Sequence, residues 1–395
     1  MPWNTPEIMD QRTEFALKAL TTDNFRALCR DHGISARVGY KWKQRFLNEG
    51  LAGMRDQSRK PHHSPEGLQE AVLCEIVRFK QRHPHWGPRK IRELYLRQRH
   101  QAPSESTFKR VLERCGLTEK RRIRSASQSG RLGQGRKAEA PNDLWTVDFK
   151  GWWYDPQGRC QPLTVRDQCS RYLLDLRAVA DARTDTVRAC FERLFERHGV
   201  PKAIRSDNGP PFACSHALLG LSRLSVWWMA NGIELERNRP GCPQDNGGHE
   251  RLHRDIACQL EGLSHGDRQA AFDTWRCEFN EERPHEALGM KVPADLYRSG
   301  SRPWPGTPET LTYQGMSSRK VTRAGTLKLQ GENIFLSQAL GGWDIGLTPR
   351  SDGSLSVHFC QLALGHIELS TSAFIPTTHA CSPPHAQAAH DIPKE

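Results

Sequence analysis

The sequence lacks the features that mark proteins of membranes and of oxidising compartments. No apolar run approaches the roughly 18 residues that a membrane-spanning helix needs. The first residues, MPWNTPEIMD, contain neither a basic segment nor an apolar segment of the kind found in secretion signals. The 12 cysteines include no Cys-x-x-Cys pair, so we expect neither a zinc ribbon nor a disulfide framework. These absences favour a reducing cytoplasm with free thiols.

Positive charge is concentrated in the front third of the chain. Residues 1–140 carry 29 Lys and Arg against 15 Asp and Glu, whereas the remaining 255 residues carry 28 against 30. A basic module attached to a nearly neutral body favours a polyanionic partner, most often a nucleic acid. The alternative is a basic surface that only interacts with water.

A helix-turn-helix DNA-binding domain is predicted over residues 1–62. Two helical patterns, at 24–35 and 35–50, meet at a turn that contains Gly33, and Ser35 suits the cap of the second helix. In such motifs the second helix enters the major groove. Its outward face carries the residues predicted to contact DNA, namely Arg37, Tyr40, Lys41, Lys43 and Arg45. A helical hairpin with a basic surface is the plainer alternative.

Two further segments precede the body of the protein. Residues 63–120 are basic and helical in pattern and predict a second helix-turn-helix or winged-helix-like DNA-binding domain, with Ser104 as a helix cap. Residues 121–143 are basic, rich in Gly, Ser and Gln, and aperiodic, which is typical of a flexible linker. Two DNA-binding domains in tandem strengthen the nucleic-acid interpretation.

Strand and helix patterns alternate over residues 144–300, which predicts an α/β domain. The expected helices include 184–199 and 216–233, and a long one follows the turn-rich stretch GCPQDNGG. Short β-patterned runs over 301–370 predict a small all-β barrel or sandwich. The tail at 371–395 is expected to be disordered.

Three acidic residues of the α/β segment stand out by their context. Asp148 lies within an apolar strand pattern, Asp207 ends a short strand, and Glu250 begins the long helix. Each has an ordinary alternative: an ion pair with Lys150 for Asp148, an Asp-Asn-Gly turn for Asp207, and a favourable helix dipole for Glu250. If the three converge, their mutual repulsion is relieved by a divalent cation, and Mg²⁺ prefers such oxygen ligands.

The sequences around these acids, WTVDFKG, IRSDNGPPF and PGCPQDNGGHERLHR, resemble the acidic motifs of retroviral-integrase-type catalytic cores. The likeness is greatest to bacterial insertion-sequence transposases, and it covers roughly residues 20–370. It implies a ribonuclease H-like fold with a mixed five-stranded sheet flanked by helices. The 42 residues between Asp207 and Glu250 exceed the interval of many superfamily members, and the extra length is expected around CSHALLGLSRLS, ahead of the third motif.

The resemblance also implies a function. Asp148, Asp207 and Glu250 are expected to be the catalytic residues and to hold two Mg²⁺ ions, for which Mn²⁺ is expected to substitute. Arg251, His253 and Arg254 are expected to meet DNA phosphates beside them. The protein is then expected to be a bacterial, nucleoid-associated DNA transposase that binds double-stranded DNA at the terminal inverted repeats of its element as a dimer or larger oligomer. It is expected to cut the DNA there and to join the 3′-hydroxyl ends to target DNA in a Mg²⁺-dependent reaction.

Two other classes of function stay open at this point. One is a DNA-binding regulator that has kept the fold and lost the chemistry, and the other is a plain ribonuclease H-like nuclease. An amino-terminal zinc site built from His62, His63, His83, His85 and Cys74 is disfavoured, because the spacings of these residues do not match a zinc pattern.

Overall fold

The computed structural model describes residues 8–57, 68–118, 136–239, 247–261 and 267–377. The chain divides into two compact units, Met1–Glu70 and Ala71–Glu395. Each unit has its own buried residues.

The first unit is a helix-turn-helix structure. It contains α1 (Ile8–Thr21), α2 (Phe25–Asp31), α3 (Ala36–Glu49) and the short 3₁₀ helix η1 (Gly50–Met54). The Ser35 side chain accepts a hydrogen bond from the Val38 backbone N–H, and Gly50 ends α3, so both predicted boundaries are confirmed. The core of the unit is formed by Phe15, Ala16, Ala19, Cys29, Ile34, Trp42 and Met54.

The second unit begins with three helices, α4 (Glu70–Arg82), α5 (Pro88–Arg99) and α6 (Glu105–Arg114). Ser104 caps α6 as predicted, by accepting from the Thr107 backbone N–H. Residues 68–118 contain no strand, so the expectation of a wing was wrong and a purely helical domain takes its place.

The predicted linker is only partly linker-like. Residues 121–135 lie outside the described residues, but the final part, 136–143, packs on the α/β domain. Asn142 and Asp143 are buried, and the Asn142 backbone N–H donates to Asp167 over 2.8 Å. A flexible linker over the whole of 121–143 was therefore wrong at its carboxyl end.

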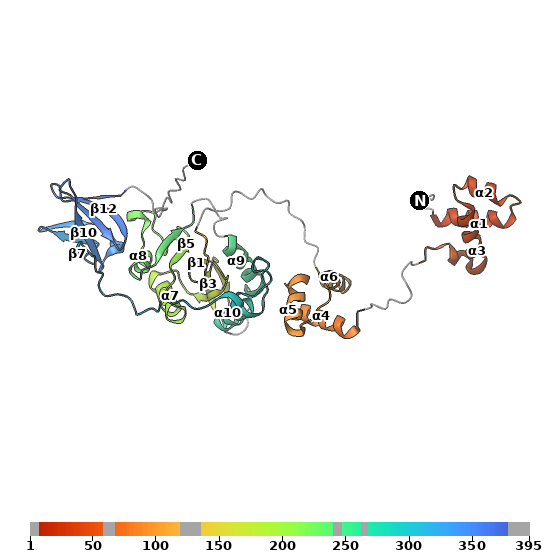
Figure 1. Ribbon diagram of the computed structural model, residues 1–395, viewed down its shortest axis with the longest axis horizontal. Helices are drawn as coiled ribbons and strands as arrows, with labels where there is room; N and C mark the ends of the chain where they lie inside the picture. Colours follow the sequence, from red (N-terminus) through yellow and green to blue (C-terminus); the bar gives the residue numbers. More distant parts are fainter. Residues whose placement is uncertain (1–7, 58–67, 119–135, 240–246, 262–266, 378–395) are drawn as a thin grey trace, which may run out of the picture. The chain divides into compact units, whose positions relative to one another are not determined.

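A mixed sheet organises the α/β domain (Figure 1). Its strands are β1 (Leu144–Phe149), β2 (Trp153–Asp155), β3 (Gly158–Asp167), β4 (Leu173–Val179), β5 (Ala203–Ser206) and β6 (Glu234–Arg237). The five main strands run in the order β4-β3-β1-β5-β6, and the short β2 pairs with the start of β3. The pairs β1–β5 and β5–β6 are parallel, whereas β1–β3 and β3–β4 are antiparallel. The predicted ribonuclease H-like sheet is therefore confirmed.

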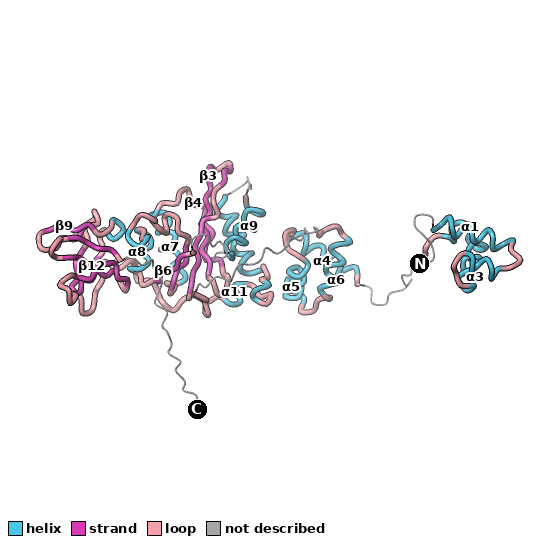
Figure 2. The backbone as a smooth tube through the Cα atoms, turned by 90° about the horizontal axis from the view of Figure 1, so that it is seen from above, coloured by secondary structure: helices cyan, strands magenta, loops and turns pink. Residues whose placement is uncertain are grey.

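Helices cover both faces of this sheet (Figure 2). On one face, α7 (Thr184–His198) and α8 (Arg223–Ala230) pack through a core that includes Trp145, Phe195 and Trp227. On the other, α9 (Gly247–Leu260) and α10 (Arg268–Cys277) pack through a second core. The chain then continues through the π-helical turn η4 (Glu278–Glu282), η5 (Glu286–Leu288) and α11 (Pro293–Leu296).

The expectation of one helix over 216–233 was wrong. The segment holds a 3₁₀ turn, η2 (Leu218–Gly220), then α8, and strand β6 follows immediately. Leu219 and Gly220 both have positive φ, which interrupts a helix. Ser222 then begins α8 through a reciprocal cap with Ser225. The apolar spacing across 221–228 therefore spans a turn and a helix.

Two antiparallel sheets form the carboxyl-terminal part. One contains β7 (Ser317–Lys320), β10 (Asp344–Pro349), β11 (Leu355–Phe359), β12 (Leu362–Glu368) and β13 (Ala373–Pro376) in the order β13-β12-β11-β10-β7. The other is the hairpin of β8 (Thr326–Leu329) and β9 (Glu332–Phe335), and η6 (Gln338–Leu340) follows it. Both sheets share a core with Leu221 and with Val226 of α8.

Two of the predictions concern this β region. The all-β region is confirmed, and through residue 377 its strand pairing does not close into a ring, so it is a pair of open sheets over one core, as in the sandwich alternative, and not a closed barrel. The expected disordered tail, 371–395, begins with the paired strand β13, because Phe374 packs on the shared core. Residues 378–395 lie outside the described part of the chain.

His198 makes the stability of this fold depend on pH. Its ring lies beside Tyr172 and Tyr297, and neither ring nitrogen has a hydrogen-bond partner. Burial, followed by the charges of Arg197 and Arg276, lowers the pKa of His198 to about 4. The unfolded chain binds this proton below a pKa of about 6.5 while the folded chain does not, so stability falls as pH drops from 6.5 toward 4.

We therefore expect His198→Phe to reduce the acid sensitivity of the protein. At pH 5 the wild type should lose about 2 kcal/mol through this residue relative to pH 7, and the variant should not. The measurement is the midpoint of thermal unfolding of the full chain at both values of pH. Equal decreases for wild type and variant would contradict the assignment.

Candidate active site

Strand pairing relates the first two predicted acids. The parallel register of β1 with β5 pairs residues that are 59 positions apart, as in Leu144 with Ala203. Asp207 follows Asp148 by the same 59 positions and comes directly after the last residue of β5. Continuing the register by two residues beyond Thr146 and Arg205 therefore places the two acids at the same level of neighbouring strands. Neighbouring strands lie about 4.8 Å apart, so a register continued in this way would bring the two residues side by side, and a shared site for their carboxylates stays a prediction.

Asp207 lies in a half-buried position with little to neutralise it. Its carboxylate accepts a hydrogen bond from the Gly209 backbone N–H over 3.3 Å. Burial raises the pKa of Asp207, and the Gly209 hydrogen bond and the charge of Arg237 oppose this rise only in part. A carboxylate in this condition is stabilised in its charged form by a nearby cation.

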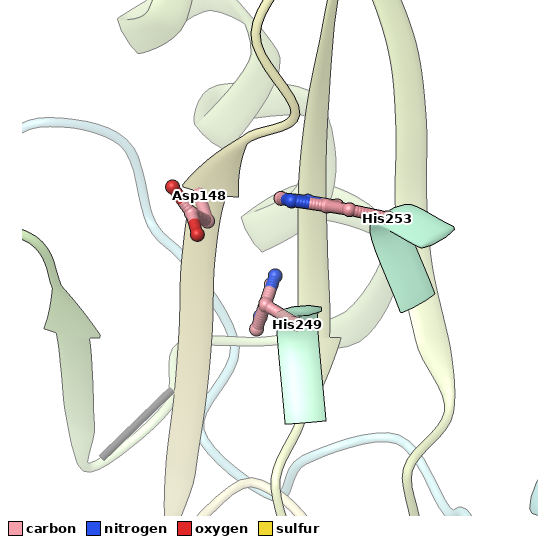
Figure 3. A group of neighbouring side chains, drawn as sticks. All are labelled: Asp148, His249 and His253. Atoms are coloured by element: carbon pink, nitrogen blue, oxygen red, sulfur yellow. The ribbon is translucent and has the colours of Figure 1, made fainter. Parts of the chain in front are cut away.

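Two histidines of α9 lie beside Asp148. Figure 3 shows both imidazoles extending from the helix toward the strand that carries this acid. One ligand atom from each of Asp148, His249 and His253 can be chosen so that all three lie within 4.8 Å of one another. Across the residues that the structure describes, this is the one cluster of three or more potential metal ligands. Neither Asp207 nor Glu250 belongs to it.

The hydroxyl of Thr164 connects this cluster. Thr164 lies opposite Asp148 in the β1–β3 register, and its Oγ1 donates to the Asp148 backbone carbonyl over 2.9 Å. The same oxygen lies 3.1 Å from Nδ1 of His249 and 2.9 Å from Nε2 of His253. If the single hydroxyl proton of Thr164 is donated to this carbonyl, both ring nitrogens donate to Thr164. Nε2 of His249 is then an acceptor, and the Thr146 hydroxyl reaches it over 2.7 Å.

Both imidazoles are neutral in this arrangement. Burial, followed by the charges of Arg166 and His253, lowers the pKa of His249 well below its usual value. Burial, followed by Lys150 and Arg166, lowers the pKa of His253 to about 4. Neutral imidazole is the form that binds metal ions. The ring nitrogens that donate to Thr164 could bind an ion only after a change of tautomer, because a metal ligand needs a free lone pair.

Arg166 lies beneath the first turn of α9. Its guanidinium donates to the Gly248 backbone carbonyl over 3.1 Å, and burial lowers its pKa to about 10. A Cβ atom added at Gly248 would collide with this guanidinium. Glycine at 248 therefore allows the helix to approach the sheet this closely.

The third predicted acid and its neighbours lie on the outer side of α9. Glu250, Arg251 and Arg254 are exposed, whereas His249, Leu252 and Ile256 face the sheet. The expected phosphate contact of His253 is not what the structure shows, because its ring is turned inward onto Thr164. That Arg251 and Arg254 contact DNA stays a prediction.

The predicted DNA-contacting residues of α3 divide into two groups. Arg37, Tyr40 and Lys41 are exposed, and Tyr40 stacks on Phe25 with 60% of its surface accessible. Arg45 instead donates to the Arg55 carbonyl over 3.2 Å and lies against the Trp42 ring. A DNA contact for Arg45 is therefore disfavoured, because the side chain holds its own unit together. Lys43 lies against Phe25 and stays a predicted contact.

Comparison with known proteins identifies the family. Two integrase core domain models match residues 138–243 and 231–293, a helix-turn-helix domain model matches 11–62, and a homeodomain-like domain model matches 38–112. The 31.7-kDa protein of insertion element IS407 from Burkholderia multivorans is 30% identical over 60% of this chain and 83% of its own length. The chain belongs to the bacterial insertion-sequence transposases with an integrase-type core.

Other known proteins also resemble this transposase. The 39.2-kDa protein of insertion element IS476 from Xanthomonas euvesicatoria is 28% identical over 62% of this chain and 70% of its own. The solved catalytic core of BIV integrase is 23% identical, with a TM-score of 0.32, over 40% of this chain and 93% of that one. The described helices of the transposase include none that is long and apolar enough to cross a membrane.

Several residues around the site of the transposase were not predicted. Thr146, Thr164 and Arg166 pack against α9 and support Asp148 and the helix. One signal was present in the sequence, because Thr146 and Asp148 in β1, and Thr164 and Arg166 in β3, are polar at alternate positions with a valine between them. The pairing of these strands with one another, and with His249, could not be read from spacing.

We expect Thr164→Val to destabilise the transposase by about 1–3 kcal/mol, because it leaves buried nitrogens of His249 and His253 without an acceptor. The measurement is thermal unfolding of the full chain at pH 7.5. Thr274→Val is the matched control, since Thr274 is exposed on α10 and its hydroxyl bonds only within its own helix. A Thr164→Val midpoint equal to that of the control would refute the role of the hydroxyl.

Proposed function

We propose that this protein binds the terminal inverted repeats of its own element, cuts the DNA there and joins the 3′-hydroxyl ends to target DNA. The observation that supports this most strongly is the β1–β5 register, which pairs Thr146 with Arg205 and, if continued by two residues, would set Asp148 level with Asp207. Two acids in that relation would form part of a site for phosphoryl transfer, and Glu250, exposed in the first turn of α9, is the proposed third acid.

The residues at this site fit divalent cations. Two carboxylates at one level repel each other when both are charged, and burial already raises the pKa of Asp207. Asp148, Asp207 and Glu250 are the proposed ligands of two Mg²⁺ ions, and Mn²⁺ would substitute because it also prefers oxygen ligands. His253, whose ring is beside Asp148, follows Glu250 by three residues. The two side chains therefore leave α9 on adjacent sides of the helix.

The bound ions would supply Lewis-acid stabilisation of the charge that develops during phosphoryl transfer. The residues of the chain then have separate tasks. The three acids orient the metal site, and Thr164 with His249 and His253 fixes α9 against β1. Arg251 and Arg254, exposed on the same helix, would hold DNA phosphates next to it.

The amino-terminal helices would recognise the DNA sequence at the element ends. Exposed Arg37, Tyr40 and Lys41 on α3 suit a recognition helix in the major groove. Because two ends of one element must be brought together, we propose that the protein works as a dimer or a larger oligomer on double-stranded DNA.

We expect Asp148→Asn, Asp207→Asn and Glu250→Gln each to abolish Mg²⁺-dependent joining while end binding persists, because each removes one proposed metal ligand. The assay follows joining of donor DNA, taken from the sequence flanking the gene, into a supercoiled plasmid. Asp185→Asn is the control, since Asp185 is an exposed carboxylate in the first turn of α7. Joining at the wild-type rate by the triple variant would end the metal-site proposal, and hydrolysis without joining by the wild type would favour a nuclease.

We expect Arg37→Ala and Lys41→Ala to weaken binding to the element ends and to lower its salt dependence. Removing one cation that neutralises a phosphate should reduce the slope of log K against log salt by about 0.9. Fluorescence anisotropy over a salt series measures this. Lys18→Ala is the control, because Lys18 is an exposed cation on α1 that pairs with Glu14. Unchanged affinity and slope for the α3 variants would remove the recognition-helix assignment.

A further inference from the structure

An exposed aromatic pair lies on the hairpin of β2 and β3. Trp152 is 57% exposed and Tyr154 is 69% exposed, and their rings meet edge to face with centroids 5.5 Å apart. Tyr154 pairs with Arg159 in the register of the hairpin, and the Arg159 guanidinium lies 5.2 Å from the centre of the Trp152 ring. We call Trp152, Tyr154 and Arg159 the aromatic platform.

The opposite side of the hairpin is firmly attached to the domain. Trp153 and Cys160 pair across the strands and are buried in the core beneath α9 and α10. The Arg268 Nε atom donates to Asp155 over 2.7 Å, and the Lys150 ammonium lies 4.9 Å from the Trp153 ring centre. The platform is thus held out on an anchored hairpin, and its exposure is not the result of a poorly packed segment.

The composition of the platform indicates its ligand. A single exposed apolar side chain is ordinary, but two adjacent large aromatics with a cation near one ring form a specific surface. Aromatic faces bind flat π systems, and the exposed Arg159 has no ion pair among the residues described here, so it can meet a negative charge. Nucleobases joined by phosphates combine these two properties.

We propose that the aromatic platform stacks unpaired bases of a DNA strand next to the active site. This rests on the proposed function, which brings DNA to Asp148, and Trp152 follows Asp148 by only four residues. In a duplex each base face is covered by its neighbours, so the platform selects nucleotides that have left the stack. It would hold the strand open where the bond is cut or joined.

The test compares a fluorescently labelled 20-nucleotide single strand with the blunt duplex of the same sequence, using the full chain without added metal. The double variant Trp152→Ala/Tyr154→Ala should bind the single strand roughly ten-fold more weakly or worse, because stacking is lost, and should bind the duplex as the wild type does. Trp152→Phe/Tyr154→Phe should restore most of the affinity. Phe335→Ala removes an aromatic of 58% exposure on β9 and should change neither.

The salt dependence of binding distinguishes base stacking from electrostatic attraction. The loss in the double alanine variant should persist at high salt, whereas the loss in Arg159→Ala should shrink as salt rises. Wild-type affinity of the double variant for the single strand overturns the inference. So does an equal loss for single strand and duplex, because that would indicate a general phosphate surface.

Failure of this inference is distinguishable from failure of the proposed function. Asp148→Asn should leave single-strand binding intact while it abolishes joining, since Asp148 is not part of the platform. A protein that shows platform-dependent binding without joining would refute the proposed chemistry alone. If the protein joins DNA but single-strand binding does not depend on the aromatic platform, only the stacking proposal is refuted.

Discussion

The parallel pairing of β1 with β5 is the constraint on which the rest of this structure depends. Hydrogen bonds between the two strands turn a separation of 59 residues along the chain into adjacency in space. The core on the α7 side covers this pairing with large aromatics, among them Trp145 of β1, Phe195 of α7 and Trp227 of α8, and such close packing disfavours a slip of the strands. A slip of one residue would move Asp207 to the opposite face of the sheet from Asp148.

The second long-range element, α9, meets the sheet in two different ways. Its later turns are apolar, with Leu252, Ile256 and Leu260 in a continuous core. Its first turns meet threonines and an arginine through directed hydrogen bonds, with Gly248 allowing close approach. Apolar packing supplies most of the stabilisation but tolerates small displacements, whereas hydrogen bonds specify one position. The helix is therefore most sharply located next to Asp148.

Much of the fold and part of the site could be predicted from the sequence. Periodicity found α7 and α9, and cap residues such as Ser35 and Ser104 marked helix starts correctly. Periodicity failed at 216–233, where backbone angles at Leu219 and Gly220 break a pattern that still looks helical. For the site, the motifs drew attention to the three acids, but strand register and the inward turn of His253 follow from tertiary packing. No local spacing encodes which threonine meets which imidazole.

The edge strand β7 of the carboxyl-terminal sheet has a consequence for the behaviour of the protein in solution. Every residue of Ser317–Lys320 is exposed, and the strand pairs with β10 along one side only, as far as the described chain extends. An unpaired strand edge is a template for a strand from another molecule. Arg319 and Lys320 put two like charges on this edge, so a second copy that approached it in the same way would meet its own charge. The short length and the positive charge of β7 thus disfavour edge-to-edge pairing between two copies of the protein.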